Sequence, residues 1–299
     1  MQKLGAVAAL TTLCVLAGVS LGGAALARTP YLLPNAFDAE RDHITLQGAL
    51  TEDDYFNPDS PLKAEVYQET TPDGAHRAIA PTAILKDLAI IEAPLPQTGT
   101  YRFSTGAFVG RTMSMAKVDG RWMMVRPVGG GDHRPPVSDH AGPDSGKPAG
   151  EGPPPGLTEA DVPAGAARMT VDNVMTVETY VSKGAPTKAA LQPSGHGLEL
   201  KPITHPNSIY VDQGFAFQLL IDGAPAPGVG VTVYRAGDVY DEHKIAAEAK
   251  TGAGGEAKLS FDRPGVYLLT AHYPGGARAP DAPPAARAYV YSLTFEVTR

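Results

Sequence analysis

The strict two-residue alternation near the C-terminal end of the chain is the feature that most constrains its fold. From 289 to 297 every second residue is Tyr, Leu, Phe or Val, and polar residues such as Ser292 and Thr294 stand between them. Successive side chains of an extended strand point to opposite faces, so this pattern predicts a β-strand with one apolar face. Further strands are expected at 215–219, 229–234, 258–261 and 266–273. Turn residues at a spacing of about ten and the lack of a long helical stripe predict an all-β sandwich.

The first half of the chain carries similar but weaker strand signals. Ile44 and Leu46 alternate with polar residues, and an apolar run extends from Ala83 to Ala93. Asp119-Gly120 separates two further apolar segments, and this pair supplies the positive φ angles of a two-residue hairpin turn. We therefore expect a second sandwich in this half, with a hairpin over 113–125.

Glycine and proline are concentrated in the middle of the chain. The segment from Gly129 to Gly156 contains almost no apolar side chains, so burial cannot offset the entropy lost on ordering it. We expect a disordered linker that extends over 129–166. The chain then divides into an N-terminal β-sandwich at 28–128 and a C-terminal β-sandwich at 167–299, both of the immunoglobulin-like kind.

The N-terminal segment predicts export. Lys3 precedes an apolar run over 4–21, and Ala25-Leu26-Ala27 forms an A-x-A cleavage site. A membrane anchor is the competing interpretation, because such a run is nearly long enough to span a bilayer. The glycines in the run and the cleavage site favour a signal peptide at 1–27. We expect a periplasmic protein that begins at Arg28 and has no stable membrane insertion.

Composition and motifs exclude several classes of function. Cys14 is the only cysteine and lies in the predicted signal peptide, which leaves no disulfide or cysteine nucleophile after cleavage. The formal net charge is −7 and no basic cluster occurs, which argues against nucleic-acid binding. Neither a G-x-S-x-G elbow nor an H-E-x-x-H zinc motif occurs. We expect a protein that is not an enzyme.

The histidines are the remaining candidates for chemistry. His196, His205 and His243 fall in predicted loops of the second sandwich, where binding residues concentrate. Imidazole nitrogen is a good ligand for nickel, cobalt or zinc. We take these three residues as the candidate metal ligands. The acidic loop Glu52-Asp53-Asp54 and the linker pair His133 and His140 are the alternatives.

Two groups of residues resemble one bacterial family. The first is the segment Thr29-Pro30-Tyr31-Leu32-Leu33-Pro34-Asn35; the second includes Gly197-Leu198-Glu199-Leu200, Thr204-His205-Pro206 and Pro264-Gly265-Val266-Tyr267. They resemble an uncharacterised family of periplasmic two-domain β proteins, often labelled the periplasmic component of a nickel/cobalt uptake system. Many relatives place a histidine directly after signal cleavage, where this chain has Arg28. The second half also resembles transthyretin-like and carboxypeptidase-regulatory-like modules, which are binding folds.

Two functional hypotheses follow. The resemblance implies a periplasmic accessory or binding protein that serves nickel or cobalt uptake, with a membrane transporter as partner. The alternative is a metal-free structural interaction module that docks on an outer-membrane receptor or a cell-wall polymer. A convergent group of at least three His, Asp or Glu side chains in the folded chain would favour the first hypothesis, and scattered histidines would favour the second.

Overall fold

The fold of the protein is given by a computed structural model. The structure describes residues 28–51, 56–64, 67–126, 157–237, 245–276, 278–279 and 281–299. Within these ranges the chain forms β-strands and two short 3-10 helices, η1 (Glu159–Asp161) and η2 (Ala189–Leu191), so the all-β expectation is confirmed. No helix in the described part is long and apolar enough to cross a membrane. The expected signal peptide and the expected linker up to 156 lie outside the described residues.

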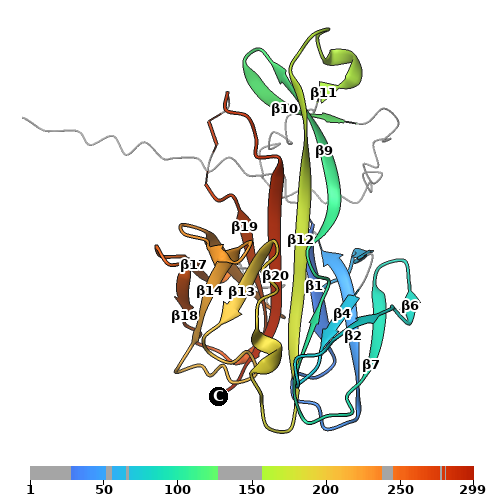
Figure 1. The fold of residues 1–299 in the computed structure, drawn as a ribbon, viewed down its shortest axis with the longest axis vertical. Helices are drawn as coiled ribbons and strands as arrows, with labels where there is room; N and C mark the ends of the chain where they lie inside the picture. Colours follow the sequence, from blue (N-terminus) through green and yellow to red (C-terminus); the bar gives the residue numbers. More distant parts are fainter. Residues whose placement is uncertain are drawn as a thin grey trace, which may run out of the picture.

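The largest sheet is organised around two long neighbouring strands, β12 (Arg168–Lys183) and β20 (Arg287–Val297), which run in parallel. In Figure 1 they stand side by side through the centre of the molecule. Antiparallel strands extend the sheet beyond β20, in the order β19 (Gly265–Tyr273), β16 (Gly230–Arg235) and β17 (Ile245–Lys250). The edge of β12 opposite β20 pairs with two strands of the first half of the chain, β9 (Phe108–Val118) and β8 (Gly99–Ser104).

Shorter strands complete this sheet at its two far edges. The hairpin partner of β9 is β10 (Arg121–Arg126), which in turn pairs with β11 (Leu157–Thr158). On the other branch, β8 pairs with β4 (Tyr67–Thr70), and β4 pairs with β5 (His76–Ile79). Figure 1 shows β9, β10 and β11 extending away from the rest of the molecule.

Two smaller sheets cover opposite faces of the central sheet, which gives three layers (Figure 1). One belongs to the first half and contains β1 (Thr29–Pro34), β2 (His43–Thr51), β3 (Ser60–Pro61), β6 (Ala83–Ile84) and β7 (Ala89–Pro94). The other belongs to the second half and contains β13 (Leu198–Pro202), β14 (Phe215–Ile221), β15 (Ala224–Pro225) and β18 (Glu256–Leu259).

Consecutive residues of β12 show how the central sheet serves both halves. Tyr180 packs into the hydrophobic cluster of the second half, and Val181 packs into that of the first. Successive side chains of a strand point to opposite faces, so the two cores lie on the two sides of one strand. The two expected sandwiches are present, but the central sheet is common to both. Their division into separate domains at the linker stays a prediction.

The core of the second half has the composition expected from the alternation. Phe215 and Phe217 of β14 and Phe295 of β20 are fully buried in one cluster. The ring centroids of Phe215 and Phe295 are 5.3 Å apart, a separation typical of favourable aromatic pairs. The expected packing of the apolar β20 face on β14 is therefore confirmed.

The predicted hairpin is also present, and it is longer than its apolar residues suggest. Asp119 and Gly120 join β9 to β10 with φ angles of 48° and 79°, the left-handed conformation that a two-residue hairpin turn requires. Beyond it, the last part of the expected linker is ordered: Leu157 of β11 pairs with Val125, and Val162 is buried against the hairpin. Residues 157–166 therefore do not belong to a disordered linker, because Leu157 and Val162 supply apolar side chains that 129–156 lacks.

Candidate functional site

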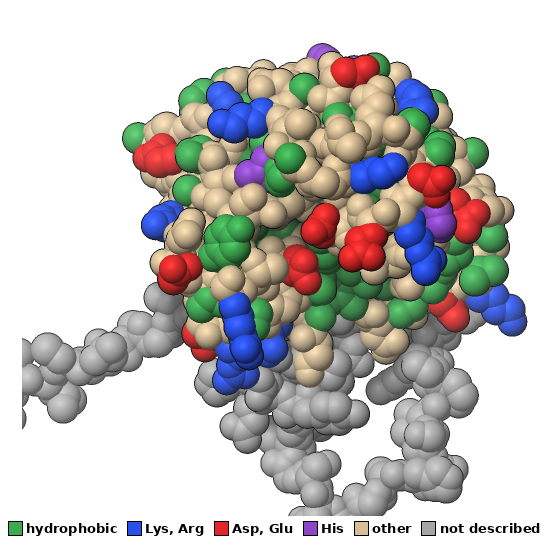
Figure 2. Space-filling model, turned by 90° about the horizontal axis from the view of Figure 1, so that it is seen from below, with side chains coloured by type: hydrophobic (Ala, Val, Ile, Leu, Met, Phe, Trp, Pro, Cys, Tyr) green, Lys and Arg blue, Asp and Glu red, His purple; other side chains and the backbone are tan. Residues whose placement is uncertain are grey.

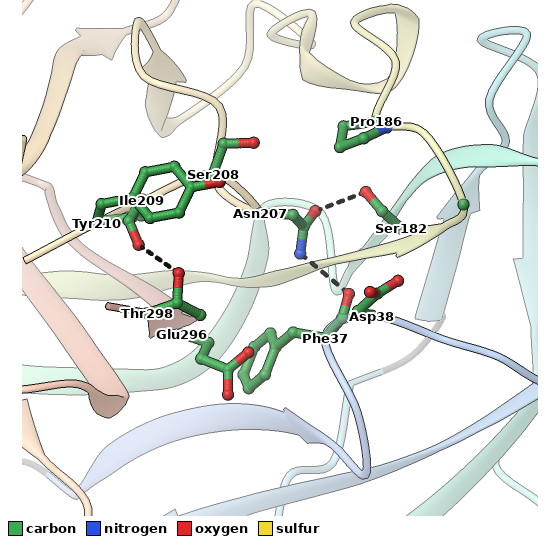
Figure 3. A pocket seen from close by; sticks show the side chains of 11 residues that line it. Phe37, Asp38, Ser182, Pro186, Asn207, Ser208, Ile209, Tyr210, Glu296 and Thr298 are labelled. Atoms are coloured by element: carbon green, nitrogen blue, oxygen red, sulfur yellow. Dashed lines mark hydrogen bonds between the residues drawn. The ribbon is translucent and has the colours of Figure 1, made fainter.

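A pocket lies where the two halves meet, at the end of the two long central strands (Figure 3). Its volume is about 340 Å³, and four segments line it: the loop after β1, the end of β12, the loop after β13 and the end of β20. Two isolated β-bridges hold these segments together, one between Asp38 and Ser182 and one between Tyr210 and Thr298. The backbone of both halves therefore fixes the shape of the pocket.

Asn207 anchors one wall of the pocket. Its side-chain amide donates hydrogen bonds to the backbone oxygens of Phe37 at 3.2 Å and Tyr180 at 3.0 Å. Its amide oxygen accepts a hydrogen bond from the Ser182 hydroxyl at 3.0 Å. Figure 3 shows Asn207 between Ser182 and Phe37. Because both donors and the acceptor are engaged, Asn207 joins the first half to the second rather than serving a ligand.

The charged groups of the pocket are carboxylates. Figure 3 shows Asp38 and Glu296 among the side chains that line it. Burial raises the pKa of the half-buried Glu296 carboxyl, and the neighbouring negative charge of Asp38 adds to this effect. Among the described residues that line the pocket there is no Lys or Arg. The pocket is therefore acidic, and a cation bound there would relieve the repulsion between its two carboxylates.

His205 is hydrogen-bonded to Asn207, which lines this pocket, and both nitrogens of its ring are engaged. Its Nε2 is 2.9 Å from the backbone oxygen of Thr187 and 3.1 Å from the Thr100 hydroxyl. Its Nδ1 accepts a hydrogen bond from the backbone N–H of Asn207 at 3.1 Å. This arrangement requires a neutral ring with the proton on Nε2, and burial accordingly lowers the pKa of His205. Both nitrogens are used, so a metal could bind only if one of these bonds broke.

His196 and His205 do not come together in a metal-binding group of the described residues. His196 is exposed. Its backbone N–H donates a hydrogen bond to the Glu199 carboxylate. The same carboxylate holds this turn by accepting hydrogen bonds from the backbone N–H groups of Ser194 and Gly195, both at 2.7 Å. His243 lies outside the described residues, as do Glu52-Asp53-Asp54 and the pair His133 and His140.

The described ranges contain no group of three or more His, Cys, Asp or Glu residues placed to hold a metal ion. Figure 2, which looks at the protein from below, shows histidines that lie apart from one another and several acidic side chains near the middle of the face. The part of the histidine site that the structure describes is therefore not assembled, and the ligand set with His243 stays a prediction.

Asp38 and Glu296 were not among the site residues predicted from the sequence. They lie near opposite ends of the chain, and no motif connects them. Glu296 interrupts the hydroxyl-bearing face of β20, and a carboxylate on such a face is the signal that could have singled it out. Its proximity to Asp38 depends on the pairing of β12 with β20 and on the bridge from Asp38 to Ser182.

A second polar group is buried where β8, β12 and β20 run side by side. Glu178 accepts hydrogen bonds from the Tyr291 hydroxyl at 2.9 Å and the Ser104 hydroxyl at 3.0 Å, and Arg102 Nη1 lies 3.9 Å from the same carboxylate. Burial raises the pKa of Glu178, and the charge of Arg102 opposes this shift. The side chains of Arg102 and Glu178 are only 7% and 3% exposed. No substrate could reach these two side chains in this conformation. The hydrogen bonds of Glu178 instead join β12 to β8 of the first half and to β20.

The fold and the pocket define a class: an all-β protein of three stacked sheets with a small acidic pocket at the junction of its two halves. Residues 25–275 match the family model described as Domain of unknown function (DUF4198), and the chain belongs to this family. No curated protein matches the sequence.

Two solved structures are similar in part. One is described as "D0-D1 domain of Intimin", with 12% sequence identity, a TM-score of 0.19, and coverage of 88% of this chain and 96% of that chain. The other is described as "Biofilm associated protein - BSP domain", with 12% identity, a TM-score of 0.20, and coverage of 89% of this chain and 29% of that chain. At these TM-scores neither likeness bears on function.

Proposed function

We propose that this chain is an exported, non-catalytic binding protein that holds a small cationic ligand in the pocket between Asp38 and Glu296. The observation that carries the proposal is the pair of carboxylates in a pocket whose described lining contains no basic residue. A volume of about 340 Å³ suits a metal ion with its waters or a small organic amine. The hydrogen bonds of Asn207 support a pocket that is formed before the ligand arrives.

Nickel and cobalt are the first cations to test, because of the resemblance to periplasmic components of nickel/cobalt uptake. In this reading the protein is an accessory that passes the cation to a membrane transporter. The pocket offers carboxylate and hydroxyl oxygens rather than imidazole. Such oxygens also suit calcium or manganese. Among the transition metals, the affinity of a given site generally rises from manganese towards nickel. Titrations with nickel, cobalt, calcium and a primary amine therefore rank the possible ligands.

Calorimetric titration of the chain from Arg28 onward tests the pocket. We expect binding by the wild type and a loss of affinity in Glu296→Gln and Asp38→Asn, which preserve side-chain size and remove charge. Glu248→Gln is the matched control, because Glu248 is an exposed carboxylate on the edge strand β17. An equal loss in the control, or no binding of any of the four ligands by the wild type, would contradict the proposal.

Export has its own test. If the A-x-A site is cleaved, the intact mass of the protein recovered from the periplasm of a Gram-negative host corresponds to a chain beginning at Arg28. Retention of residues 1–27 would contradict export by a cleaved signal.

The metal-free docking function is the second candidate, and an apolar groove favours it. Ile84 and Leu85 are 59% and 54% exposed, and they line a groove of about 550 Å³ together with Lys63 and Lys86. Exposed apolar side chains rimmed by charge are typical of interaction sites. In this reading Ile84→Asp with Leu85→Asp abolishes co-sedimentation with outer membranes or cell-wall polymer, and Glu296→Gln leaves it unchanged. Co-sedimentation that survives the double substitution would contradict docking through this groove.

A further inference from the structure

The methionines of this chain are gathered in one part of the fold. The sequence contains seven, and apart from Met1 all of them lie on the neighbouring strands β9, β10 and β12. They are Met113 and Met115 on β9, Met123 and Met124 on β10, and Met169 and Met175 on β12.

Strand register places three of these residues in one row. Met124 of β10 is the direct partner of Met115 of β9, and Met115 is the direct partner of Met169 of β12. Direct cross-strand partners share a face, with Cβ atoms about 4.5–5.5 Å apart. Met113 lies two residues before Met115 on the same strand and so points to the same side. We call Met113, Met115, Met124 and Met169 the methionine face.

The methionine face is not part of a described hydrophobic core. All four side chains are half-buried, and none belongs to the four hydrophobic clusters of the described residues. The core of the hairpin is on its other side, where Ala116 and Val125 are buried. Met113 and Met115 instead line a pocket of about 650 Å³, whose remaining walls are mostly apolar or proline side chains from the segment between β19 and β20. The flexible thioethers of these two residues therefore border open space.

A row of neutral sulfur ligands beside an apolar pocket selects a soft cation. Thioether sulfur favours Cu(I), whereas nickel and cobalt are better served by nitrogen and oxygen ligands. Adjacent side chains of the row are close enough for two or three sulfurs to meet at one ion, because methionine has three rotatable side-chain bonds. Arg278, the charged residue among the described lining, is exposed, so water and salt screen its repulsion. We propose that the methionine face is a Cu(I)-binding site, independent of the pocket at Asp38 and Glu296.

Competition with a chromogenic Cu(I) chelator tests the site, with the chain from Arg28 onward and Cu(I) alone as the probe under anaerobic, reducing conditions. We expect the wild type to withdraw Cu(I) from the chelator. Met115→Leu, Met124→Leu and Met169→Leu should each weaken the affinity by more than about tenfold, since loss of an outer-shell partner alone typically weakens a metal site by 10–100-fold. Leucine is close to methionine in volume, so these variants should retain the fold.

Met123→Leu is the matched control. Met123 neighbours Met124 on β10 but is the cross-strand partner of Ala116, whose side chain belongs to the hairpin core on the opposite face. We expect this variant to bind Cu(I) like the wild type. If the wild type does not compete with the chelator, or if Met123→Leu loses as much affinity as Met115→Leu, the methionine face is not a Cu(I) site.

The pH dependence separates thioethers from imidazoles. Thioethers carry no proton near neutral pH, whereas histidine ligands become protonated as pH falls through about 6.5. Cu(I) affinity should therefore be similar at about pH 7.5 and about pH 5. A steep loss between these values would assign Cu(I) to histidine and overturn the proposal.

The variant that combines Asp38→Asn with Glu296→Gln should still bind Cu(I) fully. This experiment distinguishes a failure of the acidic pocket from a failure of the methionine face.

Discussion

The two faces of β20 differ in chemistry but not in burial. On the face toward β14, Tyr291, Leu293 and Phe295 pack among aromatic rings. On the face toward β1, Ser292 and Thr294 are 0% and 1% exposed. At Ser292 and Thr294 the hydroxyl-bearing face is therefore as fully excluded from solvent as the aromatic face, because the sheet of the first half covers it. An alternation of apolar and polar residues distinguishes the two faces of a strand, but it does not say that the polar face meets solvent.

The two faces should contribute very unequally to stability. Phe295 has ring contacts with Phe215, Phe261 and Tyr267 at centroid distances of 5.3, 5.7 and 5.8 Å. On the other face, the hydroxyls of Ser292 and Thr294 have no hydrogen-bond partner among the described residues. Small side chains there permit β1 to approach closely, but they bury little apolar area and leave polar atoms unpaired. Substitutions on the aromatic face should therefore change the free energy of unfolding strongly, and substitutions on the hydroxyl-bearing face should change it little.

Phe295→Ala should give the largest effect. Removal of a fully buried phenylalanine from a well-packed core lowers the free energy of unfolding by about 3–5 kcal/mol. Urea denaturation followed by circular dichroism measures this loss. A change within error would mean that the aromatic face can collapse around the cavity, and the contrast between the two faces would disappear.

Arg102→Met should be nearly as severe, for an electrostatic reason. It removes the positive charge next to the buried Glu178, and an uncompensated buried charge typically lowers the free energy of unfolding by about 3 kcal/mol or more. The matched control is the combination of Arg102→Met with Glu178→Leu, which removes both charges. We expect the double variant to recover much of the loss in denaturation experiments. If it is no more stable than the single variant, the two charges are not energetically coupled.

His205 should produce a smaller effect that depends on pH. Burial lowers its pKa in the folded state, so the unfolded chain takes up a proton first as pH falls through about 6.5. The stability contributed by the neutral ring is present above that pH and decreases below it, until the folded state is also protonated. In urea denaturation at several pH values, the difference between wild type and His205→Gln should shrink on acidification. His196→Gln, at an exposed position, is the matched control, and a pH-independent difference for His205→Gln would contradict this account.

Ser292→Ala should give the smallest effect. The hydroxyl of Ser292 is buried without a hydrogen-bond partner among the described residues, so its removal relieves a desolvation penalty and leaves a side chain that fits the same space. We expect the free energy of unfolding to stay the same or rise by up to about 1 kcal/mol. A clear destabilisation would show that the hydroxyl is satisfied, and the polar face would then contribute more than the comparison allows.

Part of the candidate sites could be anticipated from the sequence, and part could not. His205 was selected because it stands in a loop, and it does lie beside the pocket, but its role there is to hold Thr100, Thr187 and Asn207. A loop position indicates access, whereas the use of the two ring nitrogens depends on the neighbours that folding supplies. Asp38 and Glu296 carried no motif because their relation is purely spatial.

The sequence by itself determined the all-β class, the turn at Asp119-Gly120 and the apolar face of β20, because each follows from the local geometry of a strand or turn. Only the tertiary structure decided that β12 and β20 lie side by side and are shared by both halves. That arrangement brings Arg102 to Glu178, sets the row of methionines in register and places Asp38 and Glu296 in one pocket. Strand order and register arise from contacts between residues far apart in the chain, and a two-residue alternation is compatible with many such arrangements.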